Sequence, residues 1–269
     1  MITSILLSLR EGLEAALIIG IVLGALRRTD RSDLKRPLWA GVLSAVIVSL
    51  LSALLLRAVD KELKGPAEQI FEGVTLLLAA GVLTWMIFWM RRQSGSMKSE
   101  LESNVNRAAN LGGGGALYFL AFISVLREGI ELALYLTASS LTSGGVQTLL
   151  GTSIGLITAS LLGYLIYTTT IRLNLQRFFT ITGVILILFA AGLIAHSVAE
   201  FNEAGIIPAI INPIWNLNPL LNDQSTIGMI FSALFGYHGS PSLTEALGYS
   251  GYILVTVFVF MKAKNLQAS

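Results

Sequence analysis

Two nearly identical charged pentads lie inside long apolar stretches of this chain, Arg-Glu-Gly-Leu-Glu at 10–14 and Arg-Glu-Gly-Ile-Glu at 127–131. One ionised side chain at the centre of a membrane helix costs about 2.5–3.5 kcal/mol to insert. Six such side chains would cost roughly 15–20 kcal/mol together before any pairing. Because the same costly pentad occurs twice, the pattern indicates a functional site within a membrane. The six residues are Arg10, Glu11, Glu14, Arg127, Glu128 and Glu131.

The composition agrees with a membrane protein. Hydrophobic residues make up 54% of the 269 residues and charged residues only 13%, whereas soluble domains carry about 25% charged residues. The chain has no cysteine, which excludes thiolate metal sites and iron–sulfur clusters. Basic residues do not cluster beside aromatic ones, so we expect no nucleic-acid partner.

We expect an all-α, polytopic membrane fold with seven transmembrane helices, because a spanning helix needs about 20 mostly apolar residues. The expected spans are residues 2–26, 37–58, 67–90, 115–140, 146–171, 178–199 and 246–262.

The basic residues predict the orientation of these spans in the cell membrane. Loop 27–36 carries five Lys or Arg and loop 91–114 carries four, whereas the loops on the opposite side carry only Arg57, Lys61 and Lys64. Cytoplasmic loops hold the excess of Lys and Arg in membrane proteins. The N-terminus is therefore expected outside and the C-terminus in the cytoplasm.

The chain also reads as an internal repeat, because a shift of 117 residues lays the first pentad on the second. Three helices separate the copies, and since three is odd, the copies should cross the membrane in opposite directions. Inverted repeats are typical of transporters, with the site at the repeat interface. The whole chain, 1–269, is then one transmembrane domain. Its expected parts are repeat one (1–90), a cytoplasmic linker (91–114), repeat two (115–199), an external loop (200–245) and the seventh helix (246–262).

The pentad spacing places the charges on one side of each helix. At about 100° per residue, Arg10, Glu11 and Glu14 share a third of the circumference, while Gly12 falls on the other side. The second pentad should have the same geometry. If the two helices face each other, four carboxylates converge, and carboxylate oxygens suit hard cations. The predicted metal ligands are Glu11, Glu14, Glu128 and Glu131, with Arg10 and Arg127 as supporting residues.

Three further residues are candidates for supporting roles. Glu72, near the outer end of span 67–90, is either an interfacial residue or the first ligand that an incoming ion meets. His196 is either a hydrogen-bonded core residue or a ligand or proton acceptor. Glu200 follows it by four residues, on the same face, and is expected at the outer membrane surface. Glu203 and Glu245 are either solvated loop charges or part of an acidic vestibule that concentrates cations.

The paired pentads resemble the Arg-Glu-Gly-x-Glu motifs of the oxidase-dependent iron permease family, which includes fungal high-affinity iron permeases and bacterial iron-uptake permeases. Trp-Met-Arg-Arg at 89–92, Phe-Glu-Gly at 71–73 and Gly-Tyr at 236–237 also resemble the family pattern.

The resemblance implies a seven-helix permease, not an enzyme, that moves iron inward with the motif glutamates as ligands. Iron would be its cargo and no cofactor is expected. Family members typically take Fe(III) from a separate ferroxidase or peroxidase-type partner, and such a partner is expected here. A homo-oligomer is left open.

Two other functions remain open on the residues alone. One is a carboxylate-based transporter of another divalent cation or a proton-coupled cation. The other is a membrane-embedded di-iron oxidase, but di-iron bundles use Glu-x-x-His pairs, and the pentads contain Glu-x-x-Glu instead.

Overall fold

The computed structural model describes residues 1–93, 113–168, 175–223 and 225–266, and every regular element among them is helical. The expected linker 91–114 lies almost wholly outside these residues. The helices are α1 (Ile2–Arg28), the short 3₁₀ helix η1 (Ser32–Leu34), α2 (Lys35–Glu62), α3 (Pro66–Gln93), α5 (Gly113–Ser143), α6 (Gly145–Thr168), α7 (Leu175–Glu203), α8 (Thr226–Phe235) and α9 (Leu243–Leu266).

Each of the seven expected spans coincides with one long helix over its described residues, and residues 169–171 of the span 146–171 lie outside them. Five of the described helices, α2, α3, α6, α7 and α9, are long and apolar enough to cross a membrane. The other two, α1 and α5, have 27 and 31 residues and are the helices that carry the charged pentads. The all-helical membrane fold is therefore confirmed at the level of these five helices.

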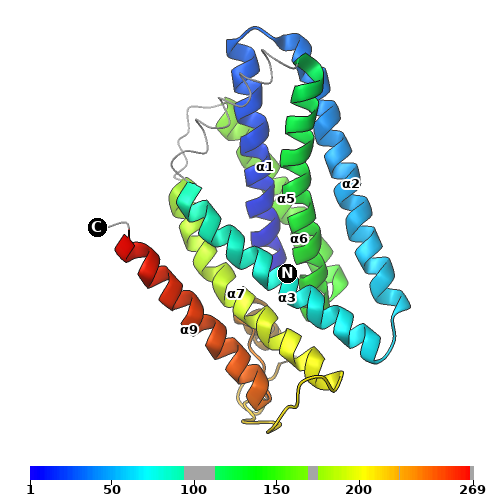
Figure 1. The fold of residues 1–269 in the computed structure, drawn as a ribbon, viewed down its shortest axis with the longest axis vertical. Helices are drawn as coiled ribbons and strands as arrows, with labels where there is room; N and C mark the ends of the chain where they lie inside the picture. The colour runs from blue at the N-terminus through cyan, green and yellow to red at the C-terminus, as the bar shows by residue number, and fades with distance from the viewer. Residues whose placement is uncertain (94–112, 169–174, 224, 267–269) are drawn as a thin grey trace.

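The long helices form two groups (Figure 1). In the first group α2 packs along α5 and α1 packs along α6, while α1 and α5 also touch each other. In the second group α3 and α9 both pack against α7. The ten-residue helix α8 lies in the segment between α7 and α9 and contacts α1, α5 and α7.

Small residues let the paired helices approach closely. A Cβ added to Gly12 of α1 would lie 2.7 Å from Cβ of Ala159 in α6. A Cβ added to Gly129 of α5 would lie 2.7 Å from Cβ of Ser49 in α2. Lipid tails are as apolar as Leu, so helices in a membrane associate through such close van der Waals packing. The side of α1 opposite the charges is thus a packing face, as the pentad spacing predicts.

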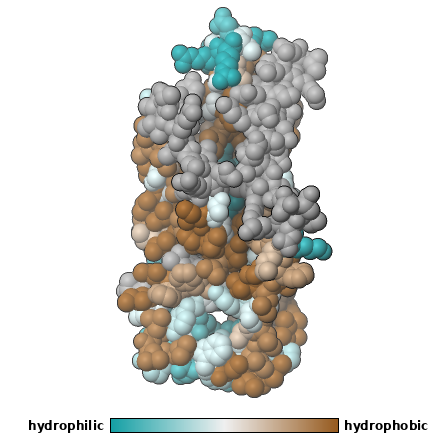
Figure 2. Space-filling model, turned by 90° about the vertical axis from the view of Figure 1, so that its left-hand side faces the viewer, coloured by the Kyte–Doolittle hydropathy of each residue, from teal (hydrophilic) through white to brown (hydrophobic). Residues whose placement is uncertain are grey.

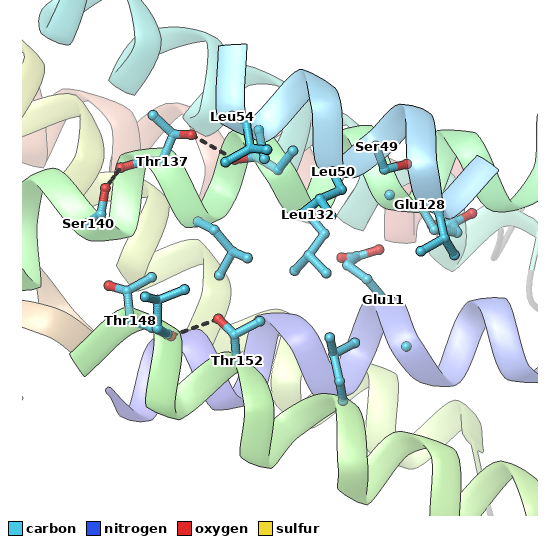
Figure 3. Close-up of a pocket in the computed structure, with 18 of the residues that line it drawn as sticks. Glu11, Ser49, Leu50, Leu54, Glu128, Leu132, Thr137, Ser140, Thr148 and Thr152 are labelled. Atoms are coloured by element: carbon cyan, nitrogen blue, oxygen red, sulfur yellow. Dashed lines mark hydrogen bonds between the residues drawn. The ribbon is translucent and has the colours of Figure 1, made fainter. Parts of the chain in front are cut away.

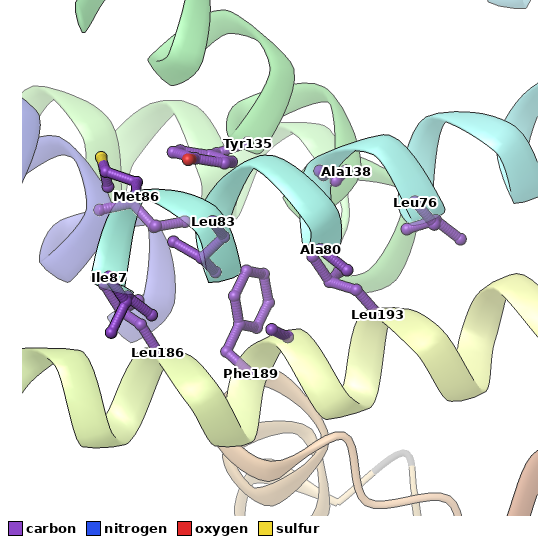
Figure 4. Packing of buried hydrophobic residues seen from close by; sticks show 13 residues of the cluster. Leu76, Ala80, Leu83, Met86, Ile87, Tyr135, Ala138, Leu186, Phe189 and Leu193 are labelled. Carbon is purple, nitrogen blue, oxygen red and sulfur yellow. The ribbon is translucent and has the colours of Figure 1, made fainter. Parts of the chain in front are cut away.

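The buried apolar residues form two clusters, which involve different halves of α5. One joins α3, α5 and α7 through residues such as Leu83, Tyr135 and Phe189 (Figure 4). The other joins α1, α2 and α5 through residues such as Leu26, Leu38 and Leu117.

The outward faces of the helices are also apolar, as a lipid environment requires. Brown hydrophobic side chains cover much of the coloured surface in Figure 2, and hydrophilic ones gather mainly at its two ends. Helix α2 alone exposes nine large apolar side chains from Trp39 to Leu55, the most open of them Leu55 at 66%.

The close approach of α2 and α5 generates a test. A Cβ on Gly41 would press against the backbone carbonyl oxygen of Tyr118 and lie 3.2 Å from the backbone nitrogen of Phe122. We expect Gly41→Ala to lower the melting temperature of the detergent-purified protein, because overpacking costs about 1–3 kcal/mol. Gly81→Ala is the matched control, since nothing lies within 4 Å of its added Cβ and alanine favours a helix by about 1 kcal/mol. Equal melting temperatures for the two variants would contradict this packing.

Candidate metal site

Helices α1 and α5 bring three glutamates of the two pentads together. Glu11, Glu128 and Glu131 each offer one carboxylate oxygen, and these oxygens all lie within 4.8 Å of one another. The three side chains are only 1%, 2% and 7% exposed. The structure therefore places the predicted ligands of both copies around one common point, which we call the carboxylate cluster.

Several oxygens of the carboxylate cluster are buried without a hydrogen-bond partner among the described residues. They are both oxygens of Glu11, Oε2 of Glu128 and Oε2 of Glu131. A buried acceptor without a partner is costly, and clustered carboxylates also repel one another. A bound cation would remove both penalties at once, so this donor set is chemically suited to hold one.

The fourth predicted ligand, Glu14, is engaged in an ion pair at the edge of the cluster. Nε of Arg10 lies 3.3 Å from Oε1 of Glu14, and the two side chains are 1% and 5% exposed. This is the i,i+4 pair that the pentad spacing predicts.

The two pentads are not geometrically identical, which corrects the expectation from sequence. Arg127 lies 2.7 Å from Oε1 of Glu128 through Nη2 and 3.6 Å from Oε1 of Glu131 through Nε. Its side chain is 42% exposed, and its guanidinium carbon lies 4.7 Å from the ring centre of Trp89. The face of the Trp89 indole attracts the Arg127 guanidinium. Arg127 is thus partly exposed, whereas Arg10 is buried.

Tyr135 is a neighbour of the carboxylate cluster that the sequence reasoning missed. It follows Glu131 by one helical turn, is fully buried, and interacts electrostatically with Glu11 and Glu131. The i,i+4 spacing was the available signal. The repeat concealed it, because the equivalent position in the first copy is Ile18.

A cavity of about 610 Å³ lies between α1, α2, α5 and α6 and reaches Glu11 and Glu128. Figure 3 shows the two carboxylates and Ser49 near one end of the cavity, Leu50 and Leu132 along its middle, and Thr137, Ser140 and Thr148 toward the other end. The hydroxyl-bearing residues that line it are Ser49, Thr137, Ser140, Thr148 and Thr152.

The other predicted supporting residues lie away from this cavity. Glu72 of α3 and Glu200 of α7 share a side-chain hydrogen bond near the ends of their helices, and neither lines the cavity. His196 lies beside His238 instead, with the ring centres 6.4 Å apart. His238 was not among the predicted site residues, although the chain contains only these two histidines.

Comparison with known proteins agrees with the motif resemblance. The iron permease FTR1 family model matches residues 1–266. The chain belongs to this family. Its members are permeases, so the chain is a permease and not an enzyme.

Bacterial relatives match over almost the whole chain. The ferrous iron permease EfeU of Escherichia coli O6:K15:H31 (strain 536 / UPEC) is 35% identical over 263 residues, covering 97% of this chain and 95% of that protein. EfeU of Escherichia coli O157:H7 is 35% identical over 262 residues, with the same coverage. EfeU of Yersinia pestis is 33% identical over 262 residues, covering 97% of this chain and 93% of its own. No solved structure matches the chain.

The different burial of the two arginines generates a prediction. We expect Arg10→Gln to lower the melting temperature more than Arg127→Gln does. Removing one partner of a buried ion pair costs about 3–5 kcal/mol, and both Arg10 and Glu14 are buried, whereas Arg127 is 42% exposed and screened. Thermal unfolding of the two purified variants in the same detergent checks this. A larger drop in melting temperature for Arg127→Gln than for Arg10→Gln would contradict the prediction that the more buried arginine contributes more to stability.

Proposed function

We propose that this permease imports iron across the cell membrane and that the cargo binds at the carboxylate cluster between α1 and α5. The observation that supports this most is the meeting of Glu11, Glu128 and Glu131, which come from two pentads more than 100 residues apart. Ionisable residues within a membrane are expensive and mark ion pathways by default. Glu14 would join the site when the ion arrives, because its carboxylate lies within electrostatic reach of Glu128 and Glu131.

The net charge of the proposed site favours a cation that can also leave. Four carboxylates and two guanidinium groups sum to a formal charge of −2, which a divalent ion would neutralise. Conduction needs binding that is strong enough to admit the ion and weak enough to release it. The arginines would lower the field of the carboxylates toward that balance.

We infer that α1, α2 and α3 form one repeat, that α5, α6 and α7 form its inverted copy, and that all seven long helices cross the membrane. The packing supports this, because swapping the two repeats turns the contact of α1 with α6 into that of α5 with α2 and leaves the contact of α3 with α7 unchanged. The N-terminus would face outward and the C-terminus the cytoplasm. Glu72 and Glu200 would then lie on the outer side, where an acidic vestibule raises the local concentration of cations.

The oxidation state of the cargo has two candidates, each with its own support. The motif resemblance implies Fe(III) supplied by a separate ferroxidase or peroxidase-type partner, and carboxylate oxygens suit that hard ion. The bacterial relatives, in contrast, carry names that specify ferrous iron. Uptake into proteoliposomes of iron kept ferrous by ascorbate, compared with ferric citrate, distinguishes the two.

The proposed site is tested by replacing its glutamates singly. We expect Glu11→Gln, Glu128→Gln and Glu131→Gln each to lower radioactive iron uptake into proteoliposomes by at least about 100-fold, since loss of even an outer-shell metal partner costs 10–100-fold. Glu62→Gln, at the exposed end of α2, is the matched control and should transport normally. Normal uptake by all three cluster variants, with equal amounts of inserted protein, would refute the shared site.

A further inference from the structure

The only two histidines of the chain meet at a place far from the pentads in sequence. His196 lies on α7, and His238 follows α8 and its C-terminal Gly236. The fold brings these segments together because Gly192 of α7 and Gly236 are so close that a Cβ on either one would overlap the other backbone. Gly236 also has a φ of 65°, which favours glycine. The two imidazole rings are consequently 6.4 Å apart and inclined at 32°.

One ring of this pair is oriented by a buried carboxylate. Nδ1 of His238 lies 2.8 Å from Oε2 of Glu245. Glu245 is 5% exposed, and its other oxygen accepts the backbone N–H of Ser242 at 3.0 Å. A carboxylate acceptor holds the proton on Nδ1 and leaves the lone pair of Nε2 available. This is the arrangement that orients metal-binding histidines.

The other ring presents a buried nitrogen that is not used within the fold. Nε2 of His196 has no hydrogen-bond partner among the described residues. The pair also lies in a negative field, because the carboxylates of Asp223 and Glu245 act on both rings. Asp223 itself is fixed by accepting the backbone N–H of Gly239 at 2.8 Å.

We propose that His196 and His238 form a second metal site, which takes a divalent transition-metal cation such as Fe(II) before it reaches the carboxylate cluster. Imidazole binds Fe, Ni, Cu and Zn, whereas carboxylates alone suit harder ions. A metal ion about 2 Å from one nitrogen of each ring would place the ring centres roughly 5–6 Å apart. The observed spacing of 6.4 Å is close to this range, and the His238 side chain is 37% exposed. The role of this site in iron uptake rests on the proposed function, whereas the placement of the two histidines does not.

Copper binding tests the site without depending on transport. The background is the full chain with Glu11→Gln, Glu128→Gln and Glu131→Gln, purified in detergent through a tag without histidine. Cu(II) is the probe because it binds nitrogen ligands most strongly among the divalent first-row metals. Electron paramagnetic resonance then reports nitrogen ligands directly, and the two histidines are the only imidazoles present.

We expect one bound Cu(II) with nitrogen hyperfine splitting. His196→Gln or His238→Gln should remove the splitting and lower the affinity at least about 100-fold, and Glu245→Gln should lower it by about 10–100-fold because it only orients His238. Gln69→Ala is the control, since it removes a side-chain hydrogen bond to Glu203 but no proposed metal ligand. Each glutamine substitution keeps side-chain polarity, and equal elution volumes verify folding.

A spectrum without nitrogen coupling, or one unchanged by the histidine variants, would overturn the second site. Iron uptake by the chain with its pentads intact is measured in parallel. Loss of copper binding with normal uptake would reject this site alone. Nitrogen-coupled copper without any iron uptake would reject the transport function and leave the site standing.

Discussion

The central physical constraint in this structure is the repulsion between carboxylates that are buried together inside an apolar helix bundle. The carboxylate oxygens of Glu11, Glu128 and Glu131 lie within 4.8 Å of one another, and burying carboxylates so close together without a partner is costly. The arginines of the same pentads offset part of this penalty through short ion pairs. The remaining oxygens, which have no hydrogen-bond partner among the described residues, are the basis of the proposed cation site.

The packing of the helices makes this arrangement geometrically available. The charged faces of α1 and α5 can meet only if neighbouring helices pack against the opposite faces. Gly12 and Gly129 allow that packing. Each glycine lies on the side away from the charges and seats its helix against a small residue of a neighbour, Ala159 and Ser49 respectively. Because α1 packs against α6 and α5 packs against α2, the position of each pentad depends on a helix that is distant in sequence.

The sequence predicted the long helices from apolar runs and the charged face of each pentad from i,i+4 spacing, because both are local patterns. The meeting of the two charged faces was predicted only on the condition that the pentad helices face each other, which the tertiary fold decides. It could not predict the different surroundings of Arg10 and Arg127, since these depend on which side chains the tertiary fold brings near, such as Trp89. The pairing of His196 with His238 depends in the same way on the contact between Gly192 and Gly236. Such contacts have no periodic signature in the chain.

The two ends of the carboxylate cluster differ chemically, although the pentads are alike. Helices α1 and α5 are antiparallel there, because Oγ of Ser4 lies 3.0 Å from Oγ of Ser139 while Glu11 meets Glu131. The buried hydroxyl groups of Ser4, Tyr135 and Ser139 lie toward that end. Arg127 and Trp89 lie elsewhere around the cluster and present a guanidinium instead. Hydroxyl oxygens can bind a cation and a fixed positive charge repels one, so the proposed site would have unequal approaches although the two pentads are nearly identical.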